Sequence, residues 1–99
     1  MLSEDKIREI ARHYGAYNQS IQAVEEMAEL TQALTKFWRY SGEKQSIISE
    51  HKENVFEELA DVKIMIAQLE VLFFAKEDVD KIVEKKIERQ LRRIAEGKE

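Results

Sequence analysis

Residues 55–74 read VFEELADVKIMIAQLEVLFF, and this stretch decides the fold. Its apolar residues recur every three or four positions, which is typical of one face of an α-helix and not of the strict alternation of a half-buried strand. At about 100° per residue, five apolar residues fall within about 60° of Glu58. They are Val55, Val62, Met65, Leu69 and Leu72. The stretch therefore predicts a long amphipathic helix with an acid near the middle of its apolar stripe.

Composition extends the helical prediction to the whole chain. There is no proline, glycine occurs three times, and 36% of the residues are charged. Few helix breakers among many strong helix formers favour long helices over a β-sandwich or barrel. Ninety-nine residues fit one domain, spanning 1–99. We expect an all-α, four-helix bundle-like domain with helices at about 3–14, 18–40, 54–74 and 77–96.

Local signals set the expected helix boundaries. Ser3 can cap the first helix, and Gly15 can end it. The stretch SGEKQSIISEHK over residues 41–52 is polar and turn-like, with room for a short helical piece. Asn54 and Glu57 form a capping box that predicts a helix start at residue 54. The second and third helices should then pack as a long antiparallel hairpin.

Composition also limits the compartment and the partners. Cysteine is absent, so there is no thiolate metal site and no disulfide. The N-terminal stretch MLSEDKIREI lacks an apolar signal core, and no apolar run approaches the roughly 20 residues of a membrane span. A formal net charge of −4 gives no general attraction to nucleic acid or anionic lipid. We expect a cytoplasmic protein without a membrane or nucleic-acid partner.

Acids interrupt the apolar arcs of both central helices. Glu26 shares its arc with Ala23, Leu30, Ala33 and Phe37, as Glu58 does with its own stripe. Glu29 and Asp61 each lie about 60° to the same side of these acids.

In an antiparallel hairpin the two acidic pairs, Glu26 with Glu29 and Glu58 with Asp61, can face each other. Four converging carboxylates repel unless a cation lies between them. Ligation by oxygen alone favours Mg²⁺ or Mn²⁺ over Zn²⁺. The sequence therefore predicts a divalent metal site between the second and third helices.

The same acids carry a resemblance to a known superfamily. EEMAE at residues 25–29 and ELAD at 58–61 are separated by 28 residues. This pattern resembles the EExxE…ExxD signature of the all-α NTP pyrophosphatases, which include MazG, the dimeric dUTPases, dCTP pyrophosphatase and phosphoribosyl-ATP pyrophosphohydrolase. The resemblance covers most of the chain and is closest to single-domain MazG-like proteins.

The resemblance implies Mg²⁺-dependent hydrolysis of a nucleoside triphosphate between its α- and β-phosphates, giving a monophosphate and pyrophosphate. The metal ligands that it implies are Glu26, Glu29, Glu58 and Asp61, the same residues that the helical geometry selects. Glu25 lies further toward the polar face and is the candidate to orient or deprotonate the attacking water; Glu57 is a weaker candidate.

Substrate phosphates also require cations. Lys36 falls on the acidic side of the second helix. The segment KKIER at residues 85–89 resembles the superfamily's NKFER-like segment, which makes Lys86 and Arg89 phosphate-binding candidates. Lys85 stands where that segment has Asn, so the contact made by that Asn is in doubt. The charge spacing of this helix also suits an ordinary solvated face.

Weaker candidates flank the predicted site. Phe37, Trp38 and Tyr40 could form a wall against a base, although aromatic residues at a helix end more often belong to a core or a subunit contact. Gln19 and Gln22 lie on the side of Glu26 and could contact substrate, or simply lie at the surface.

Two other classes of function remain open. A non-catalytic oligomerisation or adaptor protein would use the apolar stripes for packing, but it leaves Glu58 in its stripe unexplained unless a basic residue of another subunit pairs with it. A nucleic-acid binder using the last helix is disfavoured by net acidity and by Glu84 and Glu88 among the basic residues. The apolar arcs of the helices are wider than one hairpin can cover. This surplus predicts a homodimer or homotetramer.

Overall fold

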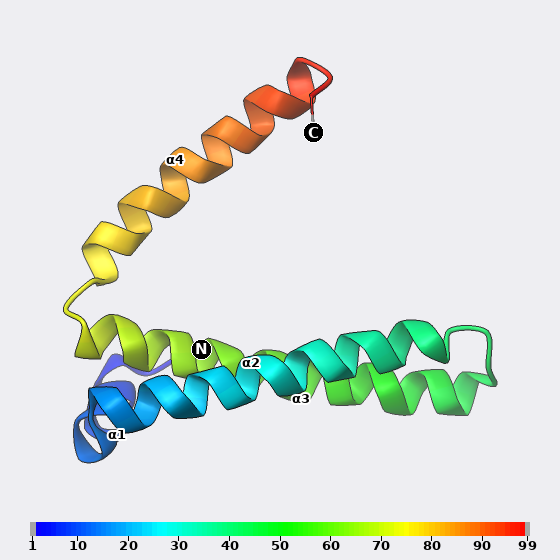
Figure 1. The fold of residues 1–99 in the computed structure, drawn as a ribbon, viewed down its shortest axis with the longest axis horizontal. Helices are drawn as coiled ribbons and strands as arrows, with labels where there is room; N and C mark the ends of the chain where they lie inside the picture. Colours follow the sequence, from blue (N-terminus) through cyan, green and yellow to red (C-terminus); the bar gives the residue numbers. More distant parts are fainter. Residues whose placement is uncertain (1, 99) are drawn as a thin grey trace.

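A computed structural model describes residues 2–98, which form four helices and no strand. The helices are α1 (Glu4–Tyr14), α2 (Ala16–Arg39), α3 (Gln45–Leu72) and α4 (Lys76–Ala95) (Figure 1). The predicted all-α class and the number of helices are confirmed. Three of the four predicted starts lie within two residues of the observed ones.

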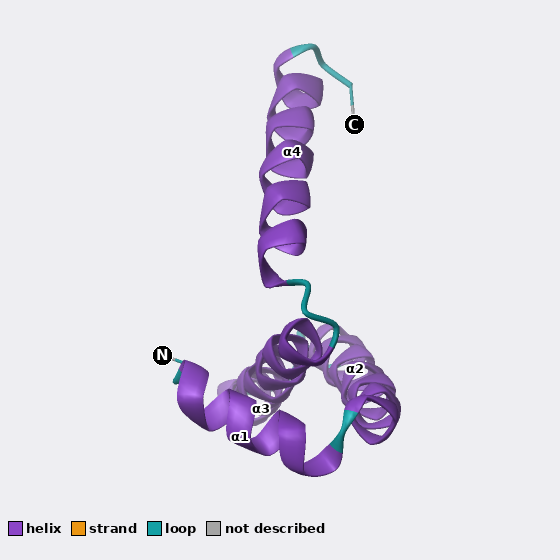
Figure 2. Cartoon of the chain, turned by 90° about the vertical axis from the view of Figure 1, so that its left-hand side faces the viewer, coloured by secondary structure: helices purple, strands orange, loops and turns teal. Residues whose placement is uncertain are grey.

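The second and third helices form the body of the molecule. They run side by side in opposite directions and are joined by a short loop at one end (Figure 1). The shorter α1 crosses the other end of this pair and packs mainly on α3 (Figure 2). The predicted antiparallel hairpin is therefore confirmed.

The first helix begins and ends as its sequence predicts. The Ser3 hydroxyl accepts a hydrogen bond from the Lys6 amide at 3.4 Å. Gly15 follows the last residue of α1 with φ of 86°, a left-handed value that glycine adopts without a steric penalty. A single glycine thus turns the chain directly into α2, which begins at Ala16 rather than at residue 18.

The third helix begins nine residues earlier than predicted, at Gln45. Asn54 therefore lies inside the helix, and the predicted capping box is wrong. Ile47, Ile48 and His51 are half-buried, and the His51 ring stacks on Tyr40 with 4.7 Å between ring centroids. Packing against the end of α2 therefore extends the helix through a stretch that has no cap of its own.

Small residues let the helices approach closely. Ala11, Ala23 and Ala33 are at most 2% exposed, and they face a core completed by Ile7, Val55, Val62 and Met65. Among the described residues no large side chain is fully buried. One copy of the chain therefore encloses only a thin core.

The last helix projects away from the other three (Figures 1 and 2). Within residues 2–98 it contacts α3 and no other helix, and none of its residues is buried. Five of its apolar side chains stay 45–62% exposed: Ile82, Val83, Ile87, Leu91 and Ile94. The Cα radius of gyration is 16.9 Å, against about 13 Å for a compact 100-residue domain.

The turn before α4 sets the direction of this projection. Phe74 has φ of 52°, in the left-handed region. Its amide donates to the Val71 carbonyl at 3.1 Å, and the Ala75 amide donates to the Glu70 carbonyl at 2.9 Å. This pair of bonds is the Schellman pattern that closes a helix C-terminus. The Phe74 side chain is 90% exposed, so no burial within the chain offsets its strained backbone.

No helix within residues 2–98 is both long enough and apolar enough to cross a membrane.

Candidate metal centre

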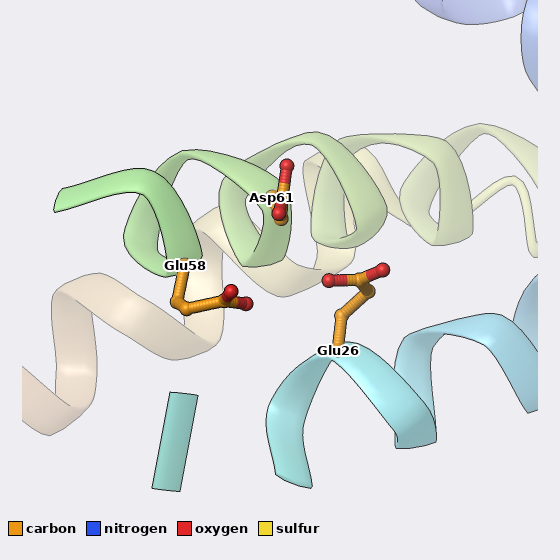
Figure 3. Close-up of side chains that lie close together, drawn as sticks. All are labelled: Glu26, Glu58 and Asp61. Atoms are coloured by element: carbon orange, nitrogen blue, oxygen red, sulfur yellow. The ribbon is translucent and has the colours of Figure 1, made fainter. Parts of the chain in front are cut away.

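Three of the four predicted ligands meet between α2 and α3. Glu26 points from α2 toward Glu58 and Asp61 on α3 (Figure 3). One carboxylate oxygen from each residue lies within 4.8 Å of the other two. Glu26 and Glu58 are half-buried, and Asp61 is exposed. The spacing brings them together because Glu58 and Asp61 are three residues apart, on adjacent positions of one helix face.

Two of these carboxylates carry an oxygen without a partner. Gln22 Nε2 donates to Glu26 Oε1 at 3.0 Å, but Glu26 Oε2 is buried and has no hydrogen-bond partner among residues 2–98. Glu58 Oε2 is also buried and also has no hydrogen-bond partner among residues 2–98. Buried polar atoms in proteins are almost always paired, so an unpaired carboxylate oxygen requires an explanation.

The environment of Glu58 disfavours its charge. Burial is the largest cause that raises the pKa of this carboxyl, and the charges of Glu29, Asp61 and Glu26 raise it further. The Glu29 side chain also lies close enough to share a hydrogen bond with protonated Glu58. Three carboxylates thus act on Glu58, and no compensating cation is among the groups that set its pKa.

The donor set fits a hard divalent cation. All the nearby donor atoms are carboxylate oxygens, which Mg²⁺ and Mn²⁺ prefer. The two unpaired buried oxygens are the atoms that such an ion would satisfy. Asp61, being exposed, leaves one side of the cluster open to solvent.

The remaining acids lie around this cluster. Glu29 is exposed and acts on Glu58, but its oxygens are outside the three-residue group. Glu25 is exposed, as its more polar position on the helix predicts. Ligation by Glu29 and a catalytic role for Glu25 stay predictions.

Lys36 lies further along the hairpin, in an acidic neighbourhood. It lines a hollow with His51, Asn54 and three glutamates, which are Glu50, Glu53 and Glu57. No ion pair joins Lys36 to these acids among the described residues. Its role toward phosphate stays a prediction, in surroundings that hold more negative than positive charge.

Lys86 and Arg89 lie on the projecting α4, and both are exposed. Because α4 does not touch α2 within the described chain, its packing in one copy does not bring these cations to the acids. Their phosphate-binding role therefore stays a prediction that depends on how α4 is covered.

A buried amide pair links α2 and α3, and its pairing was not predicted from the sequence. Gln19 and Gln68 are 6% and 2% exposed, and Gln19 Nε2 donates to Gln68 Oε1 at 2.7 Å. Gln68 Nε2 in turn lies 3.6 Å from the Met65 sulfur. The helical position of Gln19, about 20° from Glu26, could have indicated its burial. Its partner comes from the other helix, 49 residues away, and no local pattern points to it.

Comparison of the chain with models of known protein families, with curated proteins and with solved structures found no match.

Proposed function

We propose that this chain is a Mg²⁺-dependent nucleotide pyrophosphohydrolase that cleaves an NTP or dNTP between its α- and β-phosphates into a nucleoside monophosphate and pyrophosphate. One observation carries the proposal. Glu26, Glu58 and Asp61 converge, and two of them keep buried oxygens that lack hydrogen-bond partners among residues 2–98. The resemblance of EEMAE and ELAD to the all-α NTP pyrophosphatase signature supports it from the sequence side.

In this proposal the acids divide into two roles. Glu26, Glu58 and Asp61, with Glu29 beside them, hold Mg²⁺ or Mn²⁺, which supplies charge neutralisation for the phosphates and a site for water. Glu25 orients the attacking water or accepts its proton. Gln22 fixes the Glu26 carboxylate through the bond at 3.0 Å.

The cations assigned to phosphate require assembly. Lys36 is on the hairpin itself, whereas Lys86 and Arg89 are on a helix without any buried residue. We propose a homodimer or homotetramer in which the apolar stripe of α4 is covered and its basic residues approach an acidic cluster. Exposed apolar residues on the hairpin, among them Trp38 at 69% and Ile66 at 49%, add to the surface available for such contacts.

The product of the reaction tests the proposal. A complete panel of NTPs and dNTPs is incubated with the protein and Mg²⁺ or Mn²⁺, and the nucleotide product is separated by chromatography. A monophosphate with pyrophosphate is expected for at least one substrate. A diphosphate with orthophosphate, or no turnover across the whole panel, contradicts the proposal.

A non-catalytic oligomerisation or adaptor protein is the second candidate, and the exposed apolar stripe of α4 favours it. This candidate requires assembly but no metal. A protein that forms oligomers, shows no change in melting temperature with Mg²⁺ or Mn²⁺ and turns over no nucleotide fits the second candidate and not the first.

A further inference from the structure

A hollow of about 610 Å³ opens where α1 meets α2, on the N-terminal side of the acids. We call it the amide–tyrosine hollow. It is lined by Tyr14, Tyr17, Asn18, Gln19, Ile21 and Gln22. Its volume falls in the range of small-molecule sites, roughly 300–1,000 Å³.

The lining contains no charged side chain. Phosphates are bound by cations or by arrays of amides at helix ends, and hard metals by carboxylates, so neither fits the side chains of this hollow. Its side chains instead combine aromatic rings with amides. That combination suits a flat, uncharged group with hydrogen-bonding edges, because rings stack on its face and amides pair with its edge.

The two tyrosines of the hollow expose aromatic surface. Tyr17 is 79% and Tyr14 is 53% exposed, so folding of the single chain buries little of either. The Asn18 Nδ2 donates to the Tyr14 carbonyl at 3.0 Å, which leaves the Asn18 side-chain oxygen as an acceptor at the surface. A stacking ring and a hydrogen-bonding edge are thus available side by side.

The hollow is joined to the acidic cluster by one residue. Gln22 lines the hollow and also donates to Glu26 at 3.0 Å. On α2, Asn18, Gln22 and Glu29 lie within about 40° of one another, so the amide side of the hollow lies on the same flank of the helix as Glu29, and Tyr17 borders the hollow on the side away from the acids. Gln22 precedes Glu26 by four residues, about 6 Å of axial rise.

A buried amide pair, Gln19 with Gln68, supports the hollow from the core side. Gln19 lines the hollow from the core side, and its bond to Gln68 at 2.7 Å fixes its side chain. Two apolar residues would fill the same core without a hydrogen-bond requirement. The amide pair therefore gives the hollow a rigid, polar floor.

From these observations we propose that the amide–tyrosine hollow binds the nucleobase of the triphosphate whose phosphates lie at Glu26, Glu58 and Asp61. This inference rests on the proposed function. It places the base where α1 meets α2 and the phosphates toward the middle of the α2–α3 hairpin. Tyr17 supplies the stacking face, and Asn18 and Gln22 supply hydrogen bonds to the edge of the base.

Ligands with and without a base test this placement. Binding of α,β-methylene NTP analogues, which resist cleavage, and of inorganic tripolyphosphate, which has no base, is measured by calorimetry with Mg²⁺. Base stacking contributes about 1–3 kcal/mol, so Tyr17→Ser should weaken the best analogue about fivefold or more. It should leave tripolyphosphate binding unchanged. Tyr17→Phe keeps the ring and should bind the analogue within about twofold of wild type.

Trp38→Ala tests the other candidate wall for the base, because Trp38 is an exposed aromatic near the other end of α2. It should not weaken the analogue relative to tripolyphosphate. Four outcomes overturn the proposal: equal losses for both ligands in Tyr17→Ser, no loss for either, no recovery in Tyr17→Phe, or a base-selective loss in Trp38→Ala.

Nucleotide turnover separates this inference from the function on which it depends. Hydrolysis to a monophosphate together with any of those four outcomes contradicts the hollow as the base site but not the proposed pyrophosphohydrolase activity. A wild-type protein that binds no analogue and hydrolyses no nucleotide overturns both.

Discussion

Glu26 and Glu58 face each other across the α2–α3 hairpin, and each keeps a buried carboxylate oxygen without a hydrogen-bond partner among residues 2–98 (Figure 3). Two unpaired buried oxygens of the same charge oppose folding of the apo protein. By contrast, the two polar side chains that are buried as a whole among residues 2–98, Gln19 and Gln68, are bonded to each other.

Metal should stabilise the wild-type fold. Mg²⁺ or Mn²⁺ that binds only the native state raises the melting temperature, by an amount that corresponds to about 2.7 kcal/mol at a hundredfold excess over Kd. Glu58→Gln removes a ligand and a repelling charge, so this variant should lose the metal effect and remain folded. Glu9→Gln, an exposed acid on α1, is the control and should respond to metal as wild type does. If millimolar Mg²⁺ changes the melting temperatures of wild type and Glu58→Gln by the same amount, that result would falsify the site.

Stability of the apo protein should fall as pH rises above the ordinary glutamate pKa. The pKa of Glu58 is raised in the folded protein, so between the unfolded and folded values the native state binds more protons than the unfolded state. The contribution of Glu58 is therefore most favourable below the ordinary value of 4.5 and is lost as pH rises through the folded pKa. Chemical denaturation in chelator at several pH values measures this slope. Glu58→Gln should flatten it, and an unchanged slope in this variant counts against the assignment.

Loss of a metal ligand and loss of the general base should give different kinetic defects. Asp61→Asn removes a ligand and should weaken metal binding and turnover together. Glu25→Gln should retain metal and nucleotide binding but slow hydrolysis about 10²–10⁴-fold. Metal titration and steady-state kinetics on both variants separate the two effects. A Glu25→Gln enzyme with an unchanged rate removes only the role assigned to Glu25.

Cations that hold phosphate equally in the ground state and the transition state should affect substrate affinity. Lys86→Ala and Arg89→Ala should mostly raise KM and leave kcat close to its wild-type value. Lys85→Ala is the neighbouring control, because Lys85 stands where the NKFER-like segment has Asn. Steady-state kinetics on the three variants provide the measurement. Unchanged KM in the first two variants would assign these residues to a solvated helix face.

The chain should assemble into a dimer or a tetramer at micromolar concentration. Ile87 is 54% exposed on a helix without buried residues, and such an apolar stripe is stabilised by a second copy. Ile87→Glu should shift the mass measured by light scattering toward the monomer, while Glu88→Gln, its exposed neighbour, should not. Because Ile87 has little burial in one chain, the variant should still fold. A monomeric wild-type protein contradicts the prediction.

The sequence alone determined the helices and the faces on which the acids lie. Periodicity at three and four residues, the Ser3 cap and Gly15 act through neighbours in the chain, so these features follow from local geometry. The position of Glu58 in an apolar stripe follows from the same rule, and its raised pKa agrees with it. Local rules could thus identify the acids and the hairpin that carries them.

Only the tertiary structure decided which groups meet. It brought Glu26, Glu58 and Asp61 together and left Glu29 at their side, because side-chain reach across a helix pair depends on the distance and rotation of both helices. It extended α3 back to Gln45 and paired Gln19 with Gln68 through contacts between residues distant in sequence. The direction of α4 follows from the left-handed backbone at Phe74, a conformation that the residue type itself disfavours. Each of these features results from non-local packing or from a backbone choice made against local preference, and for that reason no window of sequence contains it.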